Sequence, residues 1–169
     1  ASGSILMTNG VSVASMSLTI ASNQSVAEIV SIIDGLSLTG IDARASGTRV
    51  VVDVTSGYDG VFYVIEISDP WNPVAVDSID FAETLNHVDI SGDHAYVMVS
   101  YFGFYTVDVS NPEQAVIDGE YETNWKANNI QVSGNRAFVA DGYSSFALSG
   151  GLRVINVEDP ENMYEVGYY

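Results

Sequence analysis

A seven-residue pattern that recurs three times constrains the fold of this chain more than any other feature. Apolar residues alternate with polar ones and lead to Asp-Pro or Asn-Pro, in VIEISDP at 64–70, TVDVSNP at 106–112 and VINVEDP at 154–160. The three prolines are 42 and 48 residues apart. Self-similarity at periods of this length is typical of proteins built from stacked repeats. We therefore expect a repeat architecture.

A second marker recurs in the same register. Ser-Gly stands between two alternating runs in ARASGTRVVV at 43–52, DISGDHAYV at 89–97 and QVSGNRAFV at 131–139, with the serines 45 and 42 residues apart. Within one period, alternation with β-branched and aromatic residues, broken by Gly, Asn, Asp and Pro, predicts four short strands. In the last copy these strands are predicted at 128–133, 136–141, 152–157 and 164–169.

Four-stranded repeats of about 40 to 45 residues are typical of β-propeller blades. SGNRAFVADG at 133–142, GGLRVINVEDP at 150–160 and VGYY at 166–169 also resemble the LVIVD repeat, which is found in predicted surface or secreted propellers of bacteria and archaea. The resemblance implies an all-β fold, a β-propeller-type array of four-stranded antiparallel blades. It also implies a location outside the cell or at the cell surface.

The repeat register predicts a single domain over 1–169, with repeats at about 1–38, 39–83, 84–125 and 126–169. The first copy is degenerate: it begins at the turn after a missing opening strand, and Gln24 replaces the turn proline. Its fourth strand is predicted at 26–33. The chain is then part of a larger propeller, a four-bladed ring, or a part-ring completed by another subunit.

The charge of the chain narrows its partners. Five Lys and Arg stand against 22 Asp and Glu, for a formal net charge of -17. Such a surface repels phosphate backbones and anionic lipids, which argues against nucleic-acid binding. Membrane insertion is not expected either, because no run approaches the ~20 apolar residues that a spanning helix needs. The absence of cysteine excludes disulfides, thiolate catalysis and cysteine-bound zinc.

We predict no catalytic residue and no cofactor. His87 and His94 are the only histidines and flank one predicted turn, where they are interpreted as polar turn residues, and the chain has no Gly-x-Ser-x-Gly elbow. The alternative is a propeller enzyme, or a Ca²⁺-dependent binder of glycans or small molecules, with its site in a central channel or on the loops. Asp59 and Asp141 are the candidate Ca²⁺ ligands, because their loops are rich in oxygen donors.

The loops between the second and third strands predict an interaction surface. They span 12, 9 and 15 residues, between positions 52 and 64, 97 and 106, and 139 and 154. Variation confined to one junction marks a functional face. The aromatic residues expected there are Tyr58, Tyr101, Phe102, Phe104, Tyr143 and Phe146. We expect a non-enzymatic module that binds proteins or copies of itself, including assembly into a filament or surface layer by strand pairing at a free blade edge.

Overall fold

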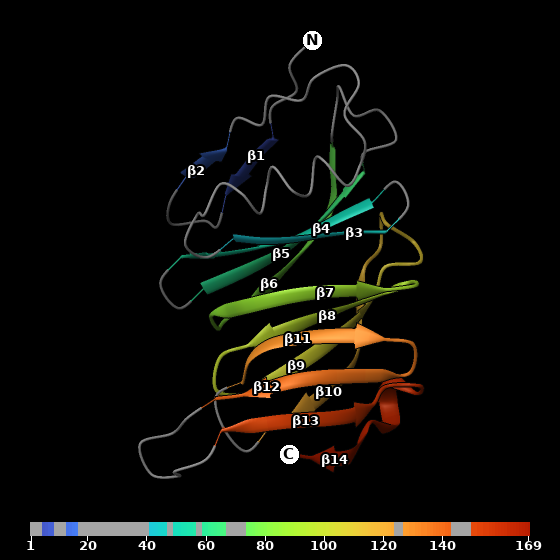
Figure 1. Ribbon diagram of the computed structural model, residues 1–169. Coiled ribbons are helices and arrows are strands. Elements are labelled where there is room, and N and C mark those ends of the chain that lie inside the picture. The colour runs from blue at the N-terminus through green and yellow to red at the C-terminus, as the bar shows by residue number, and fades with distance from the viewer. Residues whose placement is uncertain are drawn as a thin grey trace, which may run out of the picture.

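The computed structural model describes residues 5–8, 13–16, 41–46, 49–56, 59–66, 74–123, 127–142 and 150–169, with side chains from residue 60 onward. Within these ranges the regular structure is β, apart from one 3₁₀ turn, η1 (Pro160–Asn162). The strands form one two-stranded and three four-stranded antiparallel sheets, stacked in chain order (Figure 1). No helix in the described part is long and apolar enough to span a membrane.

Each four-stranded sheet is a meander in which consecutive strands pair. The first sheet contains β3 (Ile41–Ser46), β4 (Arg49–Ser56), β5 (Asp59–Glu66) and β6 (Val74–Phe81). The second contains β7 (Leu85–Ser91), β8 (His94–Val99), β9 (Gly103–Asp108) and β10 (Val116–Glu122). The third contains β11 (Ala127–Ser133), β12 (Arg136–Asp141), β13 (Gly151–Asn156) and β14 (Tyr164–Tyr168). The N-terminal pair consists of β1 (Ile5–Thr8) and β2 (Val13–Met16).

The all-β fold of four-stranded antiparallel sheets is confirmed. In the last copy the predicted strands agree with β11 to β14 to within one residue at each end. The sheets do not close into a ring: the N-terminal pair lies at one end of the stack and β14 at the other (Figure 1). The fourth strand predicted for the first copy, at 26–33, lies outside the described residues.

The three four-stranded sheets share an irregularity of the backbone in their fourth strands. In each sheet the pairing of the fourth strand with the third shifts by one residue, which leaves Val76, Asp118 and Val166 as the extra residues of three bulges. A bulge bends its strand and increases the local twist. The outer strand of every sheet is thus bent at the same position.

The core lies between neighbouring sheets. We call the side of a sheet that faces the next sheet in sequence its forward face, and the other its backward face. In the third sheet, the forward face is the side that carries the positions equivalent to the forward-face residues of the first two sheets. Phe62 and Val64 on the forward face of the first sheet pack with Val97 and Val107 on the backward face of the second. Between the second and third sheets the buried residues are Tyr96, Met98 and Phe104, with Ala127, Ile130, Ala137, Val139, Ile155 and Val157.

The inner strands hold neighbouring sheets in place. β7 lies beside β3 and β4 on one side and β11 on the other. The amide of Val132 in β11 donates to Asp89 Oδ2 in β7 at 2.6 Å. The amide of Ala115 donates in the same way to Asp77 Oδ2 of β6 at 2.7 Å. Carboxylates therefore bridge each pair of sheets that the side chains describe.

Candidate functional site

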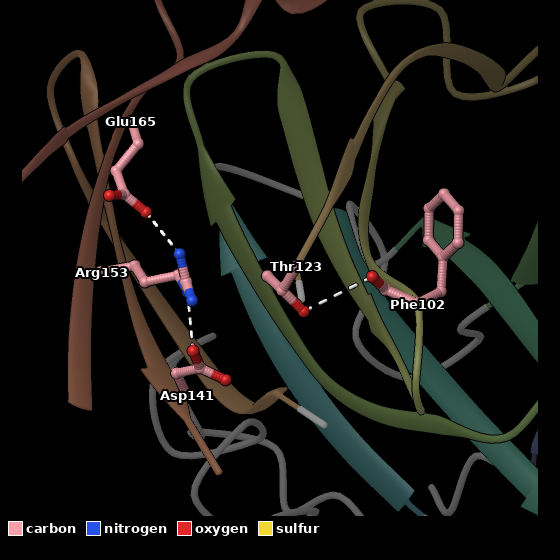
Figure 2. Close-up of polar contacts among 5 residues, drawn as sticks. All are labelled: Phe102, Thr123, Asp141, Arg153 and Glu165. Carbon is pink, nitrogen blue, oxygen red and sulfur yellow. Dashed lines mark hydrogen bonds and ion pairs between the residues drawn. The ribbon is translucent and has the colours of Figure 1, made fainter. Parts of the chain in front are cut away.

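Asp141, one of the two candidate Ca²⁺ ligands, belongs to an ion cluster on the backward face of the third sheet (Figure 2). Arg153 donates from Nε to Asp141 Oδ2 at 2.7 Å and from Nη1 to Glu165 Oε2 at 2.6 Å. The guanidinium also lies over the ring of Tyr168, 4.9 Å from its centroid. The Asp141 side chain is 1% exposed. Its charge is therefore balanced by an arginine within the sheet.

Burial acts to lower the pKa of Arg153, but the hydrogen bonds that Arg153 donates to Asp141 and Glu165, with the charges of these two carboxylates, outweigh it, so this pKa is raised. Arg153 accordingly stays charged beside the buried carboxylate. Asp59 begins β5, and its side chain lies outside the described part. Among the residues that the structure describes, no three His, Asp or Glu side chains are placed to hold a metal ion together.

The aromatic residues of the predicted interaction surface have different surroundings. Tyr101, in the turn between β8 and β9, is 78% exposed and has a φ of 64°, in the left-handed region that a non-glycine residue seldom adopts. Phe102 is half-buried and stacks on Tyr105 with 4.9 Å between ring centroids. Its carbonyl accepts hydrogen bonds from the amide and the hydroxyl of Thr123 (Figure 2). Tyr101 is the exposed aromatic residue of this turn.

Phe104 does not contribute to a surface. It is fully buried between the second and third sheets, with the rings of Tyr96 and Tyr121 beside it. Its position in the sequence is close to the turn, but in the structure it belongs to β9 and points into the core. Tyr58, Tyr143 and Phe146 lie outside the described residues.

The forward face of the third sheet carries exposed apolar side chains that the sequence did not single out. Phe138 pairs with Val154 and Ala140 with Leu152, so these four side chains share one face. Tyr164 and Tyr169 extend it, because Tyr164 pairs with Asn156 and Tyr169 exchanges backbone hydrogen bonds with Leu152. We call this surface the open face: Phe138, Ala140, Leu152, Val154, Tyr164 and Tyr169.

The equivalent positions in the other sheets are buried. Phe62 and Phe104 occupy the position of Leu152 and are 0% exposed, whereas Leu152 is 40% exposed. Val64 and Thr106 are likewise fully buried at the position of Val154. In the first two sheets the following sheet covers these residues, and no segment in the described ranges covers the third. The repeat register makes Leu152 and Val154 equivalent to buried residues of the other sheets, and this equivalence was the signal in the sequence. The alternation of apolar and polar residues alone did not reveal it.

Two hollows lie between the second and third sheets. One, of about 220 Å³, is lined by His87, Asp89, Asn129, Ile130 and Gln131. The other, of about 350 Å³, lies among the turns and is lined by Ser91, Gly92, Asp93, His94, Tyr96, Gly134, Asn135, Val157, Glu158 and Pro160. His94 Nε2 lies 2.8 Å from Asp118 Oδ2, and Asp89 binds the Val132 amide. Polar residues of both hollows thus already join strands or sheets.

Comparison with known proteins bears on the second and third sheets. The family model of the LVIVD repeat matches residues 85–123 and 126–169, which contain these two sheets. No curated protein matches the chain.

Proposed function

Because the chain belongs to the LVIVD repeat family, we propose that it is a non-enzymatic protein-interaction module, which assembles with copies of itself at the cell surface or outside the cell. The observation that carries this proposal is the open face of the third sheet. The location follows from the surface and secreted proteins that the sequence resembles. Labelling of intact cells with a membrane-impermeant reagent tests it: protection from the reagent contradicts a surface location.

The composition of the open face supports binding to another protein. Exposed apolar patches mark interaction sites in soluble proteins, and Phe and Tyr are enriched in such sites. Covering apolar surface contributes roughly 25 cal/mol per Å² removed from water. Phe138, Leu152 and Tyr164 are 36%, 40% and 56% exposed, so each has surface left to bury.

The conformation of Tyr101 supports a second contact on the loops. A tyrosine in the left-handed region costs of order 1 kcal/mol, and a strained residue of this kind is often retained for function. Tyr101 has this conformation in the β8–β9 turn, where its ring is largely exposed. We include this ring in the proposed interaction surface.

The N-terminal pair supports assembly by strand pairing. β1 and β2 pair with each other, and no other strand in the described part pairs with either. An isolated two-stranded sheet is marginally stable in water. A strand from another chain would extend such a pair through backbone hydrogen bonds, which is the edge pairing that leads to filaments or surface layers.

A non-enzymatic role is consistent with how three carboxylates of the sheets are used. Asp77 and Asp89 bind backbone amides of the following sheet, and the buried Asp141 binds Arg153. Each of these contacts joins strands or sheets, which is a structural task.

Sedimentation velocity of the purified chain over a wide concentration range tests the proposal. We expect the mass to exceed the 18.1 kDa of one chain and to rise with concentration. Electron microscopy of the same samples distinguishes small oligomers from filaments. A monodisperse monomer at every concentration contradicts self-assembly.

A further inference from the structure

We propose that the hollow of about 350 Å³ among the turns of the second and third sheets binds an ammonium group, which donates hydrogen bonds to Thr106 and Asp118 of the second sheet. We call this hollow the turn hollow. Ligand pockets begin at about 300 Å³, so its size suits a small amine or a single side chain. The turn hollow is separate from the open face, so this inference goes beyond the proposed function.

Thr106 and Asp118 depart from the repeat at neighbouring positions. Thr106 pairs with Gly119 of β10, and Asp118 is the extra residue of the bulge just before that glycine. Both positions hold valine in the other two sheets, as Val64 and Val76 in the first and Val154 and Val166 in the third. A packing contact is needed in every sheet, whereas a binding site is needed once. Two polar residues confined to the second sheet therefore point to a site.

Each of these residues has a buried oxygen that makes no hydrogen bond within the described part of the chain. Thr106 is 0% exposed, and its Oγ1 has no partner there. Asp118 Oδ2 lies 2.8 Å from Nε2 of His94, which lines the turn hollow, but its Oδ1 is buried without a partner. Buried polar atoms are nearly always bonded to protein, water or an ion. A bound hydrogen-bond donor accounts for both oxygens.

Thr106 also lies beside the wall of the turn hollow. It is directly opposite Tyr96 of β8, which lines the hollow and is 5% exposed. Pro160 lines the hollow from the third sheet, and its carbonyl oxygen and Thr106 Oγ1 would both meet a Cβ added at Gly119. The two oxygens therefore lie close together where the two sheets meet.

The oxygen atoms at this place select the chemistry of the ligand. A carboxylate and a backbone carbonyl only accept hydrogen bonds, and a threonine hydroxyl is able to accept them. An ammonium group has three N–H donors and no acceptor, so it matches Asp118 Oδ1, Thr106 Oγ1 and the Pro160 carbonyl. Its bond to the carboxylate is charge-assisted, which makes it roughly twice as strong as a neutral one.

The acidic side chains around the turn hollow favour a cation. Asp93 and Glu158 are exposed residues of its wall. Burial raises the pKa of the Tyr96 phenol, and the charges of Asp118 and Asp89 raise it further, so this wall residue lies in a negative potential. Clefts lined by one sign of charge concentrate ligands of the opposite sign.

Titration with n-butylammonium, which reproduces the end of a lysine side chain, tests the proposal by NMR. We expect the amide resonances of Gly92 and Gly134, two residues of the hollow, to shift with a dissociation constant of about 1 mM, as for a small fragment. Tetramethylammonium carries the same charge without N–H donors and should bind at least about tenfold more weakly. Equal binding of the two cations would show charge attraction alone and overturns the inference.

Thr106→Val combined with Asp118→Val is the main variant, because it introduces the residues of the other two sheets and should therefore fold. It should abolish the shifts that n-butylammonium causes. Thr106→Val alone should weaken binding without lowering the melting temperature, because it removes a buried hydroxyl that has no partner. Glu113→Gln removes one exposed charge before β10 and is the matched control, with unchanged binding. Binding that persists in the folded double variant overturns the inference.

Two further probes identify the source of the ammonium group and test for a metal. Tighter binding of Nα-acetyl-lysine methylamide than of n-butylammonium indicates a lysine of a protein partner, and weaker binding indicates a free amine; both support the site. Displacement of n-butylammonium by an equal concentration of Ca²⁺ identifies a metal site and overturns the inference. A wild type whose resonances do not shift with any amine also overturns it and leaves the proposed self-assembly unaffected.

Discussion

At the scale of single residues, one pair of positions holds an ion pair in the third sheet and two uncharged residues in the second. Arg153 and Asp141 occupy the positions that Tyr105 and Val99 occupy in the second sheet. A buried ion pair adds little stability relative to a well-packed apolar pair, but the loss of one partner leaves an uncompensated charge. The two repeats therefore allow the ion pair and the uncharged pair to be compared at equivalent positions of one chain.

Arg153→Met should lower the free energy of unfolding by about 3 to 5 kcal/mol, because Asp141 then stays buried without its counter-charge. The double variant Asp141→Val with Arg153→Tyr introduces the residues of the second sheet and should recover most of this loss. Urea unfolding of the three proteins measures both effects. A double variant as unstable as the single one would show that charge is not the cause.

Tyr96 makes stability sensitive to alkaline pH. Burial raises the pKa of this phenol above its usual value of 10.0, and the charges of Asp118 and Asp89 raise it further. The folded state then holds the proton more tightly than the unfolded state. Its contribution to stability is complete below about pH 10 and is lost as the pH rises through the folded pKa.

Tyr96→Phe should therefore reduce the loss of stability above pH 10 and change little at pH 7. Phe138 occupies this position in the third sheet, so the substitution is compatible with the fold. Burial raises the pKa of Tyr105 and Tyr121 as well, so part of the alkaline loss remains. Melting temperatures between pH 7 and 11 measure the difference, and identical profiles for the two proteins would refute it.

At the scale of elements, the fourth strands of the second and third sheets share a bulge but differ in what lies against it. β10 and β14 bulge at equivalent positions, and each bulge is followed by a glycine, Gly119 or Gly167. β10 lies against η1, which belongs to the following sheet. The glycine of β10 thus permits close packing between sheets, while that of β14 lies on the open face.

Gly119→Ala should destabilise the protein by about 1 to 3 kcal/mol, because the added methyl meets the Pro160 carbonyl and, at 2.6 Å, Thr106 Oγ1. Gly167→Ala is the matched control and should change stability by less than about 0.5 kcal/mol, because only a terminal ring must move. Thermal unfolding of dilute, monomeric samples compares them. Equal losses would mean that packing between sheets does not explain the Gly119 effect.

At the scale of the whole molecule, the protein is an open stack of sheets in which the first and third four-stranded sheets pack on the second (Figure 1). Stability in such arrays is approximately a sum of repeat and neighbour terms. Within the described ranges, no sheet covers the outer face of the third sheet, although its residues match buried ones in the first two sheets. For this reason the open face, rather than a cleft between sheets, is the surface that we propose for assembly.

Local chemistry determined the strands and turns. Alternation, β-branched residues and Asp-Pro or Ser-Gly breaks act over a few residues, so β11 to β14 could be predicted to within one residue. The placement of Asp141 against Arg153 was not predicted, because the two lie 12 residues apart across a loop and meet through strand pairing. The loop prediction included Phe104, which the strand carries into the core.

The sequence by itself determined that the chain is a series of four-stranded antiparallel units, because hydrogen-bonding and turn preferences are local. Only the tertiary structure decided which faces of those units are covered. Phe104 and Leu152 occupy the same position in two similar repeats, yet one is buried and the other is 40% exposed. The difference comes from the neighbouring sheet, because burial depends on contacts between segments that are far apart in the chain.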